Sequence, residues 1–206
     1  IQVLPPDVNE SQATFTPVGH DIRFGLTAIR NVGANVVSAV VEAREQEGRY
    51  LDFNDFMAKV PATVCNKRVI ESLVKAGAFD DMKHHRRALV QVHETAVDQY
   101  VDIKRNEAIG QDSLFDGLDD DGSPGFGISV AIPEVEEWDK MTLLGHEREM
   151  LGLYVSDHPL LGLEHLLSRG TDCSIGQLML DEERADGSSI AISGLVTSVQ
   201  RKVTKR

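Results

Sequence analysis

The apolar positions between residues 22 and 89 repeat with the spacing of α-helices, and they do so in two copies. Each copy sets a short helical stretch against a longer one across a turn that contains Gly. In the first copy the turn lies at 31–33 (NVG), and valines then recur at helical spacing over 36–41. In the second copy an apolar run over 69–74 leads into the turn at 76–78 (AGA). The duplication predicts two helix-hairpin-helix units in tandem.

The same pattern predicts helices between and after the two units. Asn35 is expected to cap a helix that runs to about Gln46, and Asp52 is expected to cap a short helix that follows. The apolar residues of this short helix should fill the space between the two units: Phe53, Phe56, Met57 and Val60. From about His85 to Glu107 the apolar positions fall on one face of a single long helix.

Both ends of the chain alternate between apolar and polar residues, as β-strands do. Residues 1–24 have the pattern of extended segments with turns, and the side chains expected to point inward are Val3, Phe15, Ile22 and Phe24. Residues 173–180 predict a short helix, and 189–206 then alternate, with Gly194 indicating a bend typical of a small barrel. The predicted fold class is mainly α: a tandem helix-hairpin-helix domain with short β segments at both ends.

The two hairpin turns are the candidate ligand-binding sites of the chain. Gly lacks a Cβ, so the backbone N–H groups of such a turn, with a helix N-terminus behind them, are able to approach a phosphate. Two hairpins in tandem would hold both backbones of duplex DNA across the minor groove without reading base sequence. The residues expected to contact DNA are Asn31, Val32, Gly33 and Ala34 in the first hairpin, and Lys75, Ala76, Gly77, Lys83, Arg86 and Arg87 in and after the second.

One position departs from the usual hairpin pattern. Asn31 stands where the first Gly of the motif is normally found, although Asn tolerates a left-handed backbone better than most residues. Gly between two helices also often serves only as a C-cap. A plain αα-hairpin without a ligand therefore remains an alternative interpretation.

The net charge of -12 looks unsuited to nucleic acid until it is divided along the chain. Residues 1–105 carry 13 Lys/Arg against 14 Asp/Glu, whereas residues 106–206 carry 8 against 19. The acidic residues therefore lie mostly beyond the hairpins, and the first half still contains local basic runs such as 83–87 (KHHRR). Few cations release few counterions, so DNA binding by this chain should be weak and sensitive to salt.

Other patterns of reactive residues are weaker. The two cysteines, Cys65 and Cys173, lack CxxC spacing, which argues against a disulfide framework or zinc site and fits a reducing cytoplasm. Neither a metal nor a cofactor is expected in this chain, and no apolar run is long enough to span a membrane. The remaining candidates are interpreted as surface residues rather than catalytic or metal-binding groups. Glu147 and Glu149 are expected to be solvated, and His84, His85 and His93 are expected to be solvated or to face phosphate.

A linker rich in Gly, Asp, Ser and Pro follows the long helix and contains the stretch GQDSLF. Gln111, Asp112, Ser113, Leu114 and Phe115 match the Gln-x-[Ser/Asp]-Leu-Phe pentapeptide with which bacterial proteins engage the DNA sliding clamp. The apolar pair would fill a pocket on the partner while the Gln amide fixes the register. Alternatively, the Leu-Phe pair folds back onto the hairpin helices.

Several longer strings resemble one family when taken together: LPPDVNES, NKRVIESLVKAGAFD, GQDSLF, EREMLGLYVSDHPL and GLVTSVQRKVTKR. They are similar to the bacterial replicative DNA polymerase III alpha subunits, the C-family DNA polymerases. The resemblance implies that the chain is a segment of a longer cytoplasmic protein, from the end of the fingers to the start of an OB domain. The implied domains are 1–20 (end of fingers), 21–107 (tandem helix-hairpin-helix), 108–133 (clamp-binding motif and acidic linker), 134–188 (helical connector) and 189–206 (start of the OB domain).

The resemblance also implies a division of labour. The polymerising aspartates and their magnesium would lie in a palm domain upstream, so this segment should have no nucleotidyltransferase activity of its own. Its implied partners are double-stranded DNA and the sliding clamp, with other replisome subunits bound by regions outside the segment.

Three alternatives remain open at this stage. A DNA repair protein with tandem hairpins and a paralogous error-prone polymerase would share much of the pattern. A small hydrolase or metal enzyme is the third, but no segment places a nucleophile, a base and an oxyanion site, or three metal ligands, at usable spacing.

Overall fold

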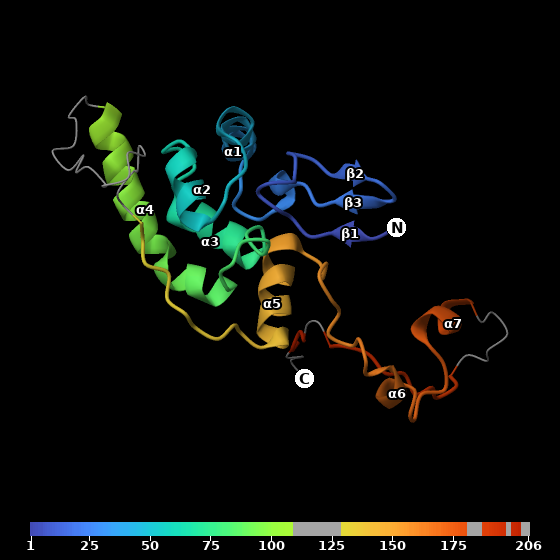
Figure 1. Ribbon diagram of the computed structural model, residues 1–206. Coiled ribbons are helices and arrows are strands. Elements are labelled where there is room, and N and C mark those ends of the chain that lie inside the picture. Colours follow the sequence, from blue (N-terminus) through green and yellow to red (C-terminus); the bar gives the residue numbers. More distant parts are fainter. Residues whose placement is uncertain (109–128, 181–186, 197–198, 203–206) are drawn as a thin grey trace. The chain divides into compact units, whose positions relative to one another are not determined.

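The computed structural model describes residues 1–108, 129–180, 187–196 and 199–202 (Figure 1). The chain divides into two compact units, Ile1–Asp157 and His158–Arg206. The first unit contains the small sheet, both hairpins and the helix that follows the linker. The second unit contains two short helices.

A three-stranded sheet opens the first unit, with strand order β1-β3-β2. β1 (Val3–Leu4) pairs in parallel with β3 (Asp21–Arg23), and β2 (Thr16–Val18) pairs with β3 in antiparallel. The expected extended structure is therefore confirmed, but the expected inward residues are mostly wrong. Only Phe24 is buried, at 2% exposure; Val3, Phe15 and Ile22 are 41%, 49% and 36% exposed. Val3 and Ile22 are register partners, so they share the exposed face of the sheet.

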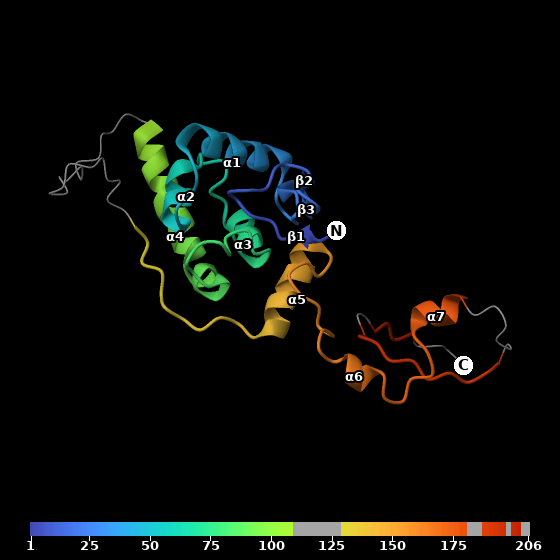
Figure 2. The same ribbon diagram turned by 45° about the vertical axis from the view of Figure 1, so that its right-hand side comes forward.

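The helices of the first unit are η1 (Leu26–Ala28, a 3-10 turn), α1 (Ala34–Glu47), α2 (Phe53–Lys59), α3 (Lys67–Lys75), α4 (Arg86–Ala108) and α5 (Lys140–Leu151). The helices α1 to α4 lie close to the ranges that the sequence predicts. η1 and α1 form the first hairpin, and α3 and α4 form the second. α2 lies between α1 and α4, and α5 lies beside α3 in both views (Figures 1 and 2).

An aromatic cluster under α2 joins the two hairpins. Phe56 packs edge-on against Tyr50 and Phe79 with ring centroids 4.8 and 4.9 Å apart, and Phe53 lies 5.5 Å from Phe79. The four residues predicted to fill this space, Phe53, Phe56, Met57 and Val60, are all fully buried. That prediction is confirmed. Burial of such rings removes a large apolar area from water, which makes this cluster a main source of stability.

Caps explain where several helices begin, with one correction. Asp52 caps α2 by accepting the N–H of Asp55 at 2.9 Å, as predicted. Asn66 caps α3 in the same way. Asn35, however, does not cap α1: it lies inside the first turn, and the N-cap residue is Gly33, which has no side chain to offer.

Two residues that were predicted to lie at the surface are buried. The carboxylate of Glu147 is only 1% exposed and accepts the N–H groups of Val155 and Ser156, at 3.0 and 2.7 Å, together with the Ser156 hydroxyl at 2.8 Å. Three donors replace the water that the buried carboxylate loses, so it fixes the turn after α5. His93 is 5% exposed, with Nδ1 2.7 Å from the carbonyl of Val90.

The second unit contains α6 (Glu164–Leu167) and α7 (Ile175–Leu180), the second of which matches the helix predicted at 173–180. Asp172 pairs with Ala191 through two hydrogen bonds of 2.9 and 2.8 Å. Over 187–196 and 199–202 the structure contains no β-strand, so the expected second β segment is not found in that part. The OB assignment of this region remains a prediction.

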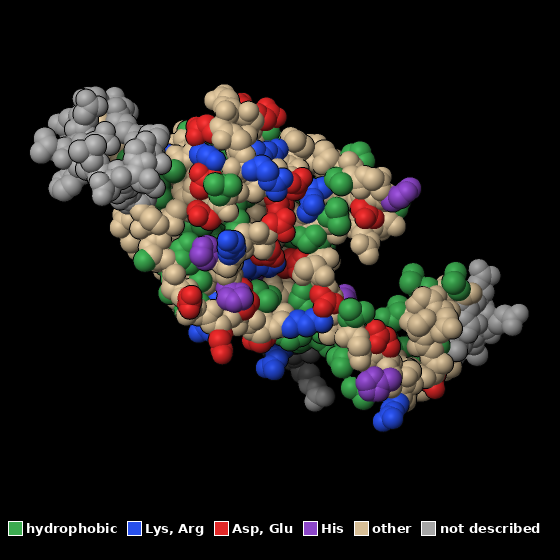
Figure 3. All heavy atoms as spheres, viewed as in Figure 1, with side chains coloured by type: hydrophobic (Ala, Val, Ile, Leu, Met, Phe, Trp, Pro, Cys, Tyr) green, Lys and Arg blue, Asp and Glu red, His purple; other side chains and the backbone are tan. Residues whose placement is uncertain are grey.

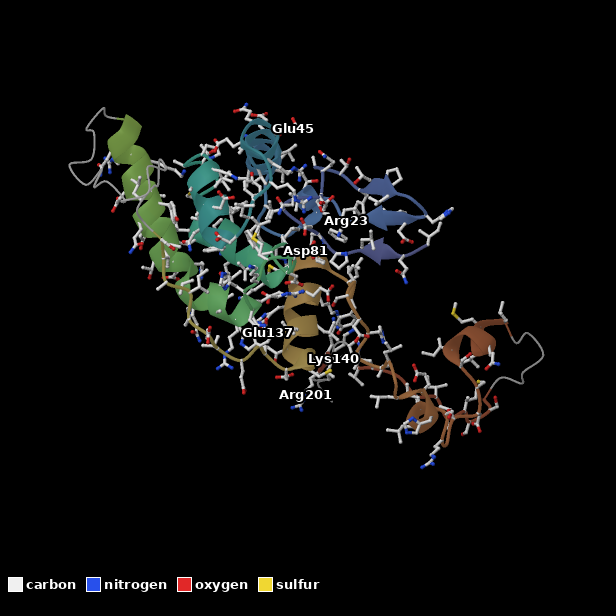
Figure 4. All side chains as sticks on the ribbon, viewed as in Figure 1. Arg23, Glu45, Asp81, Glu137, Lys140 and Arg201 are labelled. Carbon is white, nitrogen blue, oxygen red and sulfur yellow. The ribbon has the colours of Figure 1, made fainter. Side chains whose placement is uncertain are left out.

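Near the start of the chain, Asp7 is a buried carboxyl with a perturbed pKa. It is 5% exposed, and its Oδ1 accepts the N–H groups of Asn9 and Glu10 at 2.6 and 3.0 Å. Burial raises the pKa of Asp7 to about 6, and the neighbouring Asp81 carboxylate adds to the rise, while the two backbone hydrogen bonds oppose it. Asp81 lies in the loop between α3 and α4 (Figure 4).

We predict that Asp7→Asn stabilises the chain at neutral pH. The folded state holds the Asp7 proton more tightly than the unfolded chain does, so stability from this group is lost as the pH rises from about 4 through about 6. An amide keeps the turn acceptor and carries no charge, so the variant should gain at most about 3 kcal/mol in free energy of unfolding at pH 7.5, and little at pH 4. Urea denaturation at both pH values measures this difference.

Asp102→Asn, on the exposed surface of α4, is the control for a general loss of negative charge. If the Asp7→Asn difference were the same at pH 4 and pH 7.5, burial of Asp7 in its charged form would not be costly and the argument would be wrong.

Candidate nucleic-acid interface

The first hairpin is open at the N-terminus of α1. Asn31 adopts a left-handed conformation with φ of 65°, which bears out the expectation that Asn takes the place of the first Gly of the motif. Gly33 has an ordinary φ of -80° and receives no side-chain cap bond. A Cβ built on Gly33 would meet nothing within 4 Å. The first turn of a 14-residue helix therefore faces solvent without a capping side chain, which is the arrangement in which helix N-termini bind anions.

Beside this hairpin lies a depression of about 330 Å³ between the 29–33 turn, α3 and the end of α5. Its lining combines three cations with two carboxylates: Arg30, Asn31, Arg68, Glu71, Ser72, Lys75, Glu149 and Met150. Two hydrogen bonds hold the turn against its neighbours. The Asn31 amide donates to the Ser72 hydroxyl at 3.1 Å, and the Arg30 N–H donates to the Met150 carbonyl at 2.9 Å.

The cations of the depression differ in how they are engaged. Lys75 pairs with Glu71 at 2.7 Å, and this hydrogen bond lowers the pKa of Glu71, so that the carboxylate remains charged. Arg30 and Arg68 have exposed side chains. An exposed guanidinium is well suited to phosphate because it is always charged and presents parallel N–H donors.

In the second hairpin turn the backbone N–H groups of Gly77 and Ala78 are hydrogen-bonded to carbonyls of the same chain. Gly77 has φ of 84° and ends α3: its N–H donates to Val74 at 3.0 Å, and the next N–H, of Ala78, donates to Leu73 at 3.0 Å. This pair of bonds is a Schellman C-cap. The carbonyl of Ala78 in turn accepts the N–H of Val8 at 3.0 Å. The turn that was predicted to bind phosphate therefore closes a helix and anchors the N-terminal segment.

Arg86 lies under the same turn with only 8% exposure. Its guanidinium forms two bonds to the Asp80 carboxylate, at 2.8 and 2.5 Å, and a third to the Lys75 carbonyl at 3.2 Å. Burial lowers the pKa of Arg86, but the hydrogen bond and charge of Asp80 more than offset it, so the pKa rises. A Cβ on Gly77 would overlap this guanidinium. Arg86 is thus occupied inside the protein.

A carboxylate from a distant part of the chain caps α4. Glu137 accepts the N–H groups of Arg86 and Arg87 at 2.6 and 3.1 Å, so the first turn of the helix is already neutralised. Arg87 also donates to the Glu136 carbonyl at 3.3 Å. Figure 4 labels Glu137, which lies next to the segment where α4 begins. The N-terminus of the second hairpin's long helix is therefore filled, unlike that of the first.

The predicted contact residues thus fall into three groups. Asn31, Val32, Gly33 and Ala34 form the open hairpin, and Lys75 lines the depression beside it. Ala76, Gly77 and Arg86 are buried. Lys83 and Arg87 are exposed at the second hairpin, and Arg87 is tied to the segment before α5. The predicted clamp-binding residues 111–115 lie outside the described residues.

Sequence reasoning missed three residues of this region. Arg30 sits one position before the recognised turn, and Arg68 follows the Asn66 cap of α3, so each was read as part of a helix pattern. Glu137 lies 51 positions after the N–H group that it caps. For Glu137 the absence of Ser, Thr, Asp or Asn just before α4 (KHHRR) is a signal that a cap must come from elsewhere.

Charge is mixed on the surface of the first unit. On the face shown in Figure 3, Lys and Arg side chains are interspersed with Asp and Glu rather than gathered in one broad patch. Within the described ranges, His, Cys, Asp and Glu form no group of three or more that is suited to a metal ion. In that part of the chain, too, none of the helices combines the length and apolar character needed to cross a bilayer.

We predict that Gly77→Ala destabilises the chain by at least about 2 kcal/mol, because a Cβ there meets both a left-handed backbone and the Arg86 guanidinium. Gly33→Ala, where the added Cβ meets nothing within 4 Å, should cost less than about 1 kcal/mol. Urea denaturation of the two variants compares the hairpins directly. Equal losses would contradict the difference between a closed and an open turn.

Comparison with known proteins agrees with this geometry. A family model described as a helix-hairpin-helix motif matches residues 1–89, which contain the first hairpin and the second turn. The chain is similar over its full length to the DNA polymerase III subunit alpha of Saccharopolyspora erythraea (48% identity over 207 residues) and of Mycobacterium tuberculosis (48% over 209). The protein of the same name from Thermus aquaticus is 36% identical over 209 residues.

The chain spans 17%, 17% and 16% of the length of these three relatives, so the similarity concerns one part of a much longer protein. Within that part the match covers 100% of the chain in all three cases. The motif, the paired hairpins and these relatives together show that the chain belongs to the family of DNA polymerase III alpha subunits.

Proposed function

We propose that this chain binds the sugar-phosphate backbone of duplex DNA within a replicative DNA polymerase. The observation that carries the proposal is the open first hairpin: an uncapped helix N-terminus at Gly33, beside a depression lined by three cations, in the region that matches the helix-hairpin-helix model. Backbone N–H groups and cations contact phosphate without reading bases, so binding should be independent of sequence.

The geometry supports weak rather than strong binding of DNA. The net charge is -12, and the face in Figure 3 mixes both signs, so few phosphates are neutralised at once. A weak, non-specific contact suits a protein that moves along DNA, provided that a second contact keeps it close. Two linked contacts raise the effective concentration of each other, which yields a long residence from moderate affinities.

We propose that the second contact is the sliding clamp, bound through Gln111, Asp112, Ser113, Leu114 and Phe115. The support is the match of these residues to the clamp-binding pentapeptide and their position next to a DNA-binding module. The described residues on both sides belong to the first unit: α4 ends at Ala108, and Val130 exchanges hydrogen bonds with Asn54 at 3.0 and 3.1 Å.

For the longer protein we propose DNA-directed DNA synthesis in the cytoplasm, as the name of the relatives suggests. Its aspartates and magnesium would lie in a palm upstream, and other replisome subunits would bind outside this segment. The polymerising motifs are not found here, so the chain itself should be inactive. A repair protein or an error-prone polymerase with the same hairpins is the second candidate, but the relatives compared above all carry the name DNA polymerase III subunit alpha.

We predict that the chain binds a random-sequence DNA duplex and that Gly33→Val weakens this binding by roughly fivefold or more. The Cβ of the new side chain has open space, and the valine would cover the uncapped N–H groups. Fluorescence anisotropy at 50 mM salt measures the dissociation constant. Ser38→Val, which adds a similar apolar side chain at an exposed position of α1, should bind as the wild type does.

Two results would overturn the proposal of DNA binding. One is the absence of duplex binding by folded wild-type chain at low salt. The other is equal affinity of the Gly33→Val and Ser38→Val variants, which would show that the first hairpin does not contact the backbone.

We further predict micromolar binding of the chain to a bacterial sliding clamp, and its loss in a Gln111→Ala, Leu114→Ala, Phe115→Ala variant. The anchor side chains of a short peptide motif supply most of its binding energy. Calorimetric titration of purified clamp measures both. The matched control is Asp116→Ala, Leu118→Ala, just beyond the pentapeptide. Unchanged affinity in the triple variant would refute the tether.

A further inference from the structure

We infer that the depression between the first hairpin, α3 and α5 is a phosphodiester-binding subsite, in which Arg30 and Arg68 supply the phosphate contacts and Glu149 limits the affinity. The inference rests on the proposed function, since it takes the ligand to be a nucleic-acid phosphate. It adds to that function a pocket outside the hairpin turn itself and two arginines that the hairpin motif does not contain.

Three elements converge on the depression from distant parts of the sequence. The first hairpin brings Arg30, α3 brings Arg68 and Lys75, and α5 brings Glu149. The volume of about 330 Å³ is ample for a phosphate group with its neighbouring sugars at the rim. Because three cations oppose two carboxylates, the lining has a formal charge of one positive unit, in a chain that is strongly acidic as a whole.

The backbone under both arginines is held in place. The N–H of Arg30 donates to the Met150 carbonyl at 2.9 Å, and the N–H of Arg68 donates to the Asn66 side chain at 3.0 Å. A fixed main chain beneath a long side chain reduces the entropy that is lost when the guanidinium binds. Lys75 is less available, since its ammonium is already 2.7 Å from Glu71.

The adjacent residue on α3 gives a clear contrast with Arg68. Lys67 also lies in the first turn of the helix, but it points to α4, where its ammonium is 2.8 Å from the Asp98 carboxylate. It does not line the depression. Two consecutive cations on one helix thus face different neighbours, so geometry rather than net charge distinguishes them.

The second hairpin offers no equivalent subsite in the described residues. Its buried guanidinium, Arg86, is bound by Asp80, and the N–H groups at the start of α4 are bound by Glu137. The tandem hairpins are therefore unequal: the first contacts phosphate with the help of the depression, and the second holds the first in place. A contact made by one hairpin neutralises fewer phosphates than a contact made by both, so binding should still depend on salt, but less steeply than if both hairpins bound DNA.

The test compares Arg30→Ala, Arg68→Ala and Lys67→Ala in the 206-residue chain, each titrated with duplex DNA at several salt concentrations. Each phosphate contact removed should lower the slope of log K against log salt by about 1. We expect this decrease, with a threefold to tenfold loss of affinity, for each arginine variant but not for Lys67→Ala. All three side chains lie at the surface of α3 or of the turn, so folding should be preserved.

Glu149→Gln is the complementary variant, because damage to the fold does not produce a gain in affinity. Removing one carboxylate from the lining should strengthen duplex binding by about twofold to fivefold at low salt, and the gain should shrink as salt screens the charge. Glu94→Gln, on the exposed surface of α4, is the control for a general change of net charge.

A second readout separates the inference from the proposed function. Pyrophosphate and single-stranded DNA are titrated while the guanidinium Nε–H signals of Arg30 and Arg68 are followed by NMR. Shifts of both signals with pyrophosphate, together with no duplex binding, would keep the subsite and refute the proposed DNA contact. Duplex binding that is equally sensitive to Lys67→Ala and Arg68→Ala, or pyrophosphate that shifts neither arginine, would overturn the subsite alone.

Discussion

The buried guanidinium of Arg86 is the constraint on which the second hairpin depends. It joins the end of α3, through the Lys75 carbonyl, to the loop residue Asp80 and so fixes the distance between the two helices. A buried arginine without its partners would carry an uncompensated charge, so loss of Asp80 should cost far more than loss of a surface ion pair. The same guanidinium leaves no room for a Cβ at Gly77. Packing alone therefore requires glycine at the second turn.

This requirement gives the two turns different physical roles despite their similar sequences. At Gly77 the positive φ and the Schellman bonds close a helix, and the turn then receives the N-terminal segment through Val8. At Gly33 neither condition holds: φ is -80° and the space around the Cα is empty. In the first turn Asn31 adopts the left-handed conformation, and its amide donates a hydrogen bond to Ser72 on α3. The second hairpin, which is fixed by its own packing, thus supports the exposed turn of the first hairpin through α3.

The sequence predicted helices well because their apolar periodicity and local caps are encoded within a few residues. Thus α4 and the buried face of α2 were anticipated closely. It failed where a residue's environment is set by a distant segment. Glu147 was placed in solvent because its partners lie in the turn after α5, not on its helix. Glu137 was not recognised as a cap because it is far along the chain from α4. For the same reason the sequence found the hairpin turns but not the depression, whose lining comes from three separate elements.

The acidic residues of the chain differ in how strongly they oppose DNA binding, because some of their carboxylates are hydrogen-bonded inside the fold. Glu137 caps the N-terminus of α4, which would otherwise attract phosphate, and Glu147 is hydrogen-bonded inside the fold. Hydrogen-bond donors of the chain offset part of the field of these carboxylates, so they contribute less to repulsion of DNA than their formal charge suggests. Glu149, by contrast, is exposed and lines the cationic depression. A carboxylate in that place reduces the attraction of the neighbouring arginines for an anion, so a phosphate bound there would be released more easily than from the arginines alone.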